Sequence, residues 1–310
     1  MKLKNFAKAI SFILILTVIF SFTGCFGGKK TALVISGTNI DSEIYDYYLD
    51  KVTAKPNDYG LNQNPPKDEA REAAIKQCIR YLAINTDFHE RGLSLTSAEK
   101  VVVADNVNNY QIRFGSHYKK IGVSRETLTK IFTCEAYESA IFNSVYDKGV
   151  NDKKAEAEIK SYFNLNYIAF QNICAYFTGS DGSKISPVEK EAIINSFRKI
   201  SSASGTDSGK FAQECTNAGY TASEVIIIKK NSDGYPEGFF EKVSAQAKST
   251  VSTYVYDECV FNIRAESLEE LGEGVYANYR SACIKDMYKA NWEQYVADYC
   301  EKFTLEEAKI

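Results

Sequence analysis

The stretch NYIAFQNICAYF, residues 166–177, divides the chain into two kinds of sequence. It is rich in β-branched and aromatic residues and apolar on both alternating faces, which is typical of a strand in the middle of a sheet. Three later stretches share this character, SEVIIIKK (223–230), TVSTYVY (250–256) and CVFNIRA (259–265), with helical patterns at 187–201, 210–217 and 239–247. We therefore predict a compact α+β domain over residues 165–266.

The sequence before this domain is predicted to be mostly helical. A short β-branched strand, TALVISG (31–37), leads into a helix capped by Asp41 or Ser42. Further amphipathic helices are expected at 67–91, from the capping box at Thr96 to near Gly115, from Ser124 to Lys148, and at 152–164.

The sequence after the domain returns to helix. Residues 277–303 are predicted to form one long helix, whose stripe consists of Ile284, Tyr288, Trp292, Tyr295 and Tyr299. Such an aromatic stripe needs a groove, and the strand and helix that open the mature chain offer one. The predicted fold class is therefore α+β, with a helical module made of 31–164 plus 267–310 and an α+β domain inserted at 165–266.

The N-terminus has the features of a secretory signal that ends at a cysteine. Three lysines precede an uncharged run at 9–22, which is shorter than the ~20 apolar residues of a transmembrane helix. Thr23-Gly24-Cys25 then resembles the lipobox of bacterial lipoproteins, although Phe22 stands where leucine is usual. The resemblance implies a signal peptide at 1–24, a diacylglyceryl group on Cys25 and a tether at 25–30. An ordinary signal peptide followed by a chance cysteine is the alternative.

The charge and cysteine content exclude some classes of partner. Removal of the signal would delete three lysines and no acid, so the formal net charge would change from −3 to −6. An acidic chain lacks the basic footprint of a nucleic-acid-binding protein. Besides Cys25, seven cysteines would remain without a C-x-x-C spacing, which indicates small buried hydrophobic residues more than a disulfide framework or a zinc site. We expect no metal and no cofactor.

The order of elements resembles the PrsA and SurA family of extracytoplasmic foldases. The resemblance rests on the lipoprotein signal, the opening strand and helix ALVISGTNIDSEIYDYYLDKV (32–52), the inserted domain, which is parvulin-like, and the returning C-terminal helix. It implies a helical N/C module that acts as a chaperone cradle for unfolded exported chains, and an extracytoplasmic location at the cell membrane. It also implies a domain that is a peptidyl-prolyl isomerase in many members.

The catalytic residues of active parvulins do not carry over to this sequence. Those proteins have a histidine on the first strand and another on the last, whereas Asn172 and the segment 259–261 occupy the matching places here. The two histidines of the chain, His89 and His117, lie in the helical part and are predicted to be surface or helix-end residues. No catalytic residue is therefore assigned, and enzyme activity is left open.

The chain is rich in tyrosine, with 21 residues, and this is the feature of its composition that most suggests a binding function. Most are expected in the core, where the ring is buried and the hydroxyl finds a partner. Five lie off the clear core stripes and are candidates for contact with unfolded segments: Tyr47, Tyr59, Tyr110, Tyr118 and Tyr162.

Three functions follow as expectations. The first is a membrane-anchored, ATP-independent chaperone or foldase whose partners are unfolded or partly folded exported polypeptides. The second is an active, divergent parvulin-type prolyl isomerase. The third is a cell-envelope binding or scaffold lipoprotein.

Overall fold

The computed structural model describes residues 30–179 and 181–310, and these form two compact units. The first unit contains residues 30–145 and 291–310, and the second contains residues 146–290. The predicted signal peptide and Cys25 lie outside the described residues. In the described part of the chain, no helix is long and apolar enough to cross a membrane.

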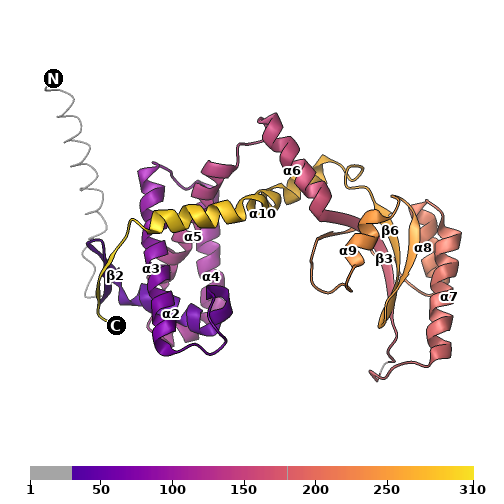
Figure 1. Cartoon of the computed structure of the whole chain (residues 1–310), viewed down its shortest axis with the longest axis horizontal. Coiled ribbons are helices and arrows are strands. Elements are labelled where there is room, and N and C mark those ends of the chain that lie inside the picture. Colours follow the sequence, from indigo (N-terminus) through magenta and orange to yellow (C-terminus); the bar gives the residue numbers. More distant parts are fainter. Residues whose placement is uncertain (1–29, 180) are drawn as a thin grey trace. The chain divides into compact units, whose positions relative to one another are not determined.

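The first unit combines a small sheet with long helices (Figure 1). Its sheet has the order β2-β1-β7 and is antiparallel, with β1 at Thr31–Ile35, β2 at Thr38–Asp41 and β7 at Leu305–Ala308. The helices are α2 (Ser42–Ala54), the 3-10 turn η1 (Pro56–Tyr59), α3 (Lys67–Glu90), α4 (Ser97–Lys120) and α5 (Arg125–Tyr146). Apolar residues from β1, α2, α3, α4 and α5 form its main core.

The C-terminal part of α10 (Glu273–Cys300) completes the first unit. Figure 1 shows this part crossing α3 and α5. Trp292 packs edge-on against Phe142 of α5, with ring centroids 5.6 Å apart, and its indole N–H donates to Glu138 at 3.1 Å. The hydroxyls of Tyr295 and Tyr299 donate to Asp87 and Glu90 of α3. The aromatic stripe thus packs in a groove, as expected, but α3 and α5 form this groove and not the opening strand and first helix that the sequence suggested, because the long helices offer the larger apolar surface.

The second unit is built on an antiparallel sheet of order β4-β3-β6-β5. The strands are β3 (Tyr167–Tyr176), β4 (Ile226–Lys229), β5 (Val251–Val255) and β6 (Cys259–Glu266). The helices are α6 (Lys153–Asn166), α7 (Pro187–Ser204), α8 (Ser208–Asn217), α9 (Phe239–Ala245) and the first part of α10.

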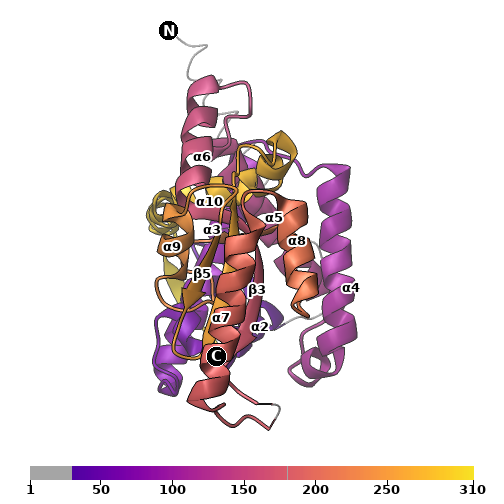
Figure 2. The same cartoon turned by 90° about the vertical axis from the view of Figure 1, so that its right-hand side faces the viewer.

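Helices cover both faces of this sheet. Figure 2 shows α7 and α8 on one side, where Phe197 and Phe211 pack against Ile173 and Val260. On the other face, Phe239 of α9 packs against Phe170 and Phe261. The central strand β3 is buried from both sides because of this arrangement, which explains its nearly continuous apolar sequence. The α+β class is therefore confirmed.

Some local details differ from the sequence predictions, among them the first helix, where Asp41 is the N-cap residue but its side chain makes no cap hydrogen bond, and α10, which runs from Glu273 to Cys300 and not over 277–303. Helix α4 does not end near Gly115 but continues to Lys120, because Tyr118 is buried in its last turn and Gly122, at φ +77°, provides the stop. Strands β2 and β7 were not predicted. Both are only four residues long and are strands because they pair with β1. Such pairing is a tertiary contact that the local sequence does not encode.

Candidate binding site

A cavity of about 680 Å³ opens in the first unit among α2, η1, α3, α4 and α5. Seven Tyr and Phe side chains line it: Tyr47, Tyr48, Tyr59, Tyr81, Tyr110, Phe114 and Tyr118. We call this cavity the tyrosine pocket. It contains four of the five tyrosines that the sequence singled out, brought together from α2, η1 and α4.

Lys51 is at the centre of the aromatic wall. Its ammonium nitrogen lies 5.3, 5.1 and 5.9 Å from the ring centroids of Tyr47, Tyr110 and Tyr118. These distances fit cation–π attraction to three rings at once. Desolvation lowers the pKa of Lys51, but hydrogen bonding to the Tyr118 phenol and the nearby charges outweigh it and raise the pKa, so the lysine is charged at neutral pH.

The rings around Lys51 differ in how far they are exposed. Tyr47 and Tyr118 are almost fully buried, with exposed fractions of 4% and 2%, and are therefore part of the core as well as of the pocket wall. Tyr59 and Tyr110 are half-buried, and Phe114 is 46% exposed. Contact with a large ligand would therefore fall mainly on Tyr59, Tyr110 and Phe114.

Charged groups line the other side of the pocket. Arg80 donates to Glu138 at 2.6 Å, and His117 lies 2.9 Å from Asp50. Desolvation, helped by the negative charge of Glu138, raises the pKa of Glu135, although its side chain faces the solvent of the pocket. The wall thus offers paired charges, one central cation and neutral phenols.

This chemistry suits weak binding of varied polypeptides. Desolvation raises the pKa of Tyr47 well above its usual value, so its phenol stays protonated near neutral pH. Phenol rings present an apolar face together with a hydroxyl that donates or accepts hydrogen bonds, and they lose little conformational entropy on binding. The pocket therefore matches apolar and aromatic side chains and backbone amides.

The fifth candidate, Tyr162, is not part of the tyrosine pocket. It lies half-buried on α6 in the second unit, where desolvation, followed by the charge of Asp286, raises its pKa. Sequence reasoning also missed residues that the pocket does contain, above all Lys51 and Glu135. The spacing of Tyr47 and Lys51, one helical turn apart on α2, was the available signal.

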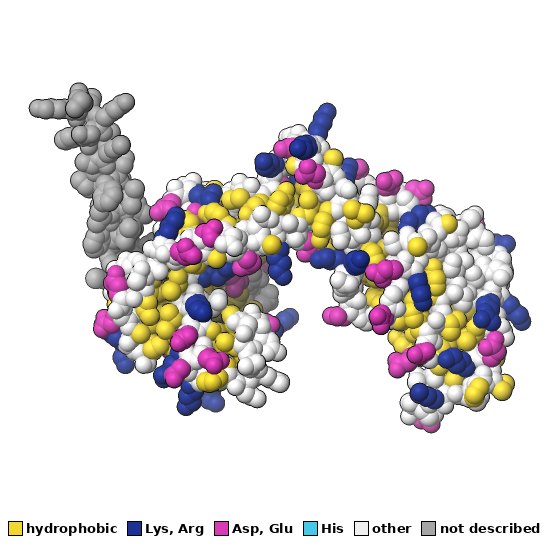
Figure 3. All heavy atoms as spheres, in the orientation of Figure 1, with side chains coloured by type: hydrophobic (Ala, Val, Ile, Leu, Met, Phe, Trp, Pro, Cys, Tyr) yellow, Lys and Arg dark blue, Asp and Glu magenta, His cyan; other side chains and the backbone are white. Residues whose placement is uncertain are grey.

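The sheet of the second unit carries the other candidate site. Asn172, Cys174, Cys259 and Phe261 share the α9 face of β3 and β6, since they have the strand parity of the residues packed there. Half-buried apolar residues adjoin them, and Figure 3 shows hydrophobic side chains at the surface of this unit beside lysines and arginines.

The groups on this face are poorly suited to acid–base or nucleophilic catalysis. Desolvation raises the pKa of Cys174 to about 12, so its thiol stays protonated at neutral pH. Both histidines lie in the first unit, His89 at the end of α3 and His117 beside Asp50. In residues 30–179 and 181–310, no group of three or more His, Cys, Asp or Glu side chains could hold a metal ion.

Similarity to known proteins is found among solved structures. No protein-family model matches it, and no curated protein is significantly similar in sequence. Among solved structures it is similar to foldase protein PrsA from Streptococcus pneumoniae, with 14% identity, 89% of this chain and 92% of that chain covered, and a TM-score of 0.42. It is also similar to PrsA from Lactococcus lactis, with 12% identity, 90% and 95% covered, and a TM-score of 0.39.

A third similar structure is a SurA-like chaperone of Campylobacter jejuni, with 10% identity, 90% of this chain and 99% of that chain covered, and a TM-score of 0.32. These three structures are described as two PrsA foldase proteins and a SurA-like chaperone.

Proposed function

We propose that this chain is an ATP-independent extracytoplasmic chaperone or foldase that binds unfolded segments of exported polypeptides. The observation that carries the proposal is the tyrosine pocket, where four predicted contact residues and Lys51 line one cavity in the helical unit. The proposed client is an unfolded chain with exposed aromatic or apolar side chains.

Weak and varied binding of this kind needs no bound nucleotide. Burial of a client's apolar surface contributes about 25 cal/mol per Å² before the cost of ordering the chain. A protein that binds the unfolded state lowers the concentration of free unfolded chain by mass action, and with it the rate of aggregation. Dissociation is fast when the affinity is low, so the client can fold after release.

Lipid anchoring through Cys25 is part of the same proposal. The support for it is the signal sequence, the small residues before the cysteine and the polar tether behind it. Two acyl chains anchor a protein stably, whereas one binds only marginally. The anchor would keep the tyrosine pocket near the site where exported chains emerge.

The test removes the more exposed aromatic contacts of the pocket and leaves the buried rings of Tyr47 and Tyr118 in place. We expect the double variant Tyr59→Ala, Phe114→Ala to bind a denatured client about fivefold more weakly, or worse, because truncation of an aromatic anchor typically costs more than ~1 kcal/mol. Ala54→Trp, which adds bulk at an exposed position of the pocket wall, should weaken binding in the same way. Fluorescence anisotropy with the labelled client and light scattering during its aggregation measure both effects.

The matched control is Tyr176→Ala. Tyr176 is 62% exposed and lies outside the pocket wall, so it tests whether the loss of any surface tyrosine has the same effect. Circular dichroism checks that each variant remains folded. Unchanged aggregation suppression by the folded pocket variants would contradict the proposal and would leave the scaffold lipoprotein as the better reading.

A further inference from the structure

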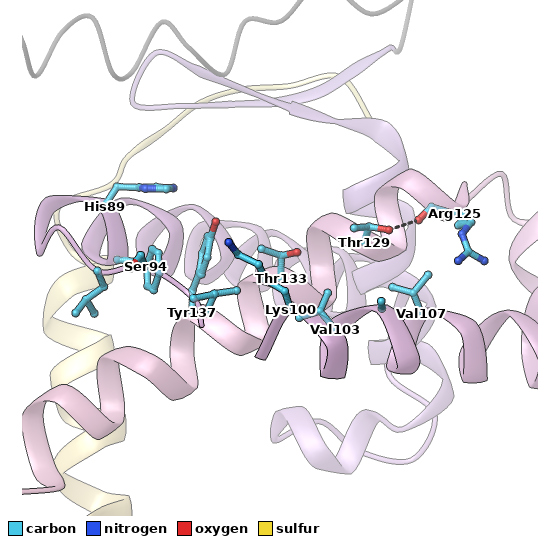
Figure 4. A pocket seen from close by; sticks show the side chains of 13 residues that line it. His89, Ser94, Lys100, Val103, Val107, Arg125, Thr129, Thr133 and Tyr137 are labelled. Carbon is cyan, nitrogen blue, oxygen red and sulfur yellow. Dashed lines mark hydrogen bonds between the residues drawn. The ribbon is translucent and has the colours of Figure 1, made fainter. Parts of the chain in front are cut away.

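A second cavity, of about 540 Å³, lies in the first unit where the end of α3 and the loop after it meet α4 and α5. It shares no residue with the tyrosine pocket. Its size falls in the range of ~300–1,000 Å³ that is usual for sites of small ligands and short segments. Figure 4 shows the side chains that line it. We call it the basic pocket.

The floor of the basic pocket is apolar. Phe88, Val103 and Val107 are buried there, with exposed fractions of 2%, 7% and 1%. Tyr137 stacks on Phe88 with ring centroids 3.7 Å apart. Leu93 and Leu95 of the loop add to the same surface. An apolar ligand group of moderate size would therefore be desolvated on this floor.

The rim of the pocket is basic and has no acid. Lys100, Arg125 and His89 line the cavity together with the hydroxyls of Ser94, Thr129 and Thr133, and no carboxylate is among the lining residues. Within the described part of the chain, Lys100 has no ion-pair partner. Arg125 donates to Asn108, a neutral amide that leaves its charge uncompensated.

Lys100 and Arg125 are the charged cations among the lining residues. Figure 4 shows His89 toward one end and Arg125 toward the other, with the Lys100 amino group directed toward Tyr137 and Thr133 between them. This local concentration of positive charge is notable in a chain of net charge −3, because the general field of an acidic protein repels anions. The rim therefore offers charge complementarity to an anion that also has apolar groups.

We propose that the basic pocket binds acidic–apolar segments of client polypeptides, with an apolar side chain on the floor and an aspartate or glutamate of the client at Lys100. The proposal rests on the proposed chaperone function and adds a client preference to it. The apolar floor disfavours a fully hydrated anion such as inorganic phosphate, since such an anion gains nothing from the burial of Phe88 and Val103. The two pockets would then bind different features of one unfolded chain. The tyrosine pocket would bind aromatic groups, and the basic pocket would bind acidic–apolar pairs.

The experiment uses the mature protein and a set of labelled short peptides. One peptide alternates leucine with glutamate, the second has glutamine in place of glutamate, and the third has lysine. We expect the acidic peptide to bind most tightly by fluorescence anisotropy and to lose affinity as salt rises, because the contacts are partly exposed to solvent. Lys100→Gln should weaken the acidic peptide about fivefold and leave the glutamine peptide nearly unchanged.

Two further variants keep the result interpretable. Lys76→Gln, at an exposed position of α3 outside both pockets, removes the same charge elsewhere and should change little. Ala104→Trp, at an exposed position of the pocket wall, should block binding of both the acidic and the glutamine peptide without disturbing the core.

The possible results separate this inference from the proposed function. Aggregation suppression by the wild-type protein without any preference for the acidic peptide would overturn the inference and leave the chaperone proposal standing. Equal loss with Lys100→Gln and Lys76→Gln would overturn it too, because the effect would then come from net charge. A third result would also contradict the inference. If a free fatty acid bound in place of the peptide, and Ala104→Trp abolished that binding, the pocket would be assigned to lipid.

Discussion

Glu135 shows how single residues shape the tyrosine pocket. Desolvation raises its pKa above the ordinary value of 4.5, so the folded state disfavours its charged form. The penalty is fully present above the folded-state pKa and disappears below the unfolded-state pKa, because the carboxyl group is then protonated in both states. The charged carboxylate of Glu135 therefore lowers the free energy of unfolding at neutral pH. Residues with shifted pKa values gather at functional sites.

We therefore expect Glu135→Gln to stabilise the protein at pH 7, by no more than about 1 kcal/mol because the side chain faces solvent. The gain should shrink as the pH falls toward 4.5, the ordinary pKa of the group. Urea unfolding at several pH values measures it. Glu138→Gln is the control and should lower the free energy of unfolding, since the Glu138 carboxylate accepts hydrogen bonds from Arg80 and Trp292. A pH-independent effect of Glu135→Gln would contradict the assignment.

The elements of the fold differ in how far sequence could predict them. The long helices were predicted because their apolar spacing and caps are local, as in the capping box of Thr96 and Glu99 that the structure confirms. Strand β7 was not predicted, because its four exposed residues are strand only through pairing with β1. In the pocket, single tyrosines could be selected from sequence. Their meeting around Lys51, and the burial of Tyr47 and Tyr118, are tertiary facts.

The C-terminal half of α10 gives the prediction at the scale of elements. Trp292 is 6% exposed and touches Phe142, Glu138 and Tyr295. Trp292→Ala should lower the free energy of unfolding of the first unit by about 3–5 kcal/mol, through lost contacts and the cavity left behind. Glu293→Ala, an exposed neighbour paired with Arg80 at 3.3 Å, should cost less than about 1 kcal/mol.

Hydrogen exchange monitored by mass spectrometry separates the two units in this experiment. Amides of β3 and β6 should keep their protection in Trp292→Ala, because these strands pair with each other and pack under their own helices. Equal loss of protection in both units would show that the chain unfolds as one cooperative body, and the predicted division into domains would be wrong.

At the scale of the whole molecule, the proposed lipid anchor depends on one residue, Cys25. Cys25→Ser should move the protein from the membrane fraction to the soluble fraction or leave an unprocessed precursor, because an acidic mature chain has no polybasic segment for anionic lipid. Fractionation followed by immunoblotting measures the outcome, with Cys300→Ser as the control for loss of a thiol. A processed Cys25→Ser protein that stays at the membrane would refute the lipid anchor.

The predicted inserted domain, residues 165–266, can be removed because its two ends are neighbours. Ala169 of β3 pairs with Glu266 of β6, and Phe163 of α6 lies 5.7 Å from Tyr276 of α10, measured between ring centroids. A short linker can therefore join residue 164 to residue 267. The variant should keep its suppression of client aggregation, because both pockets lie outside the deleted segment.

The same variant tests what the domain contributes as an enzyme. On the α9 face, Asn172 stands where the family resemblance would put a histidine, and burial keeps the Cys174 thiol protonated, so neither residue is suited to polarise or attack the imide. We expect the intact protein to isomerise a proline-containing tetrapeptide near the uncatalysed rate, with no change on deletion. Turnover comparable to an active parvulin, lost when residues 165–266 are removed, would make the isomerase the right assignment, with catalysis that depends on an apolar, desolvated face more than on histidines.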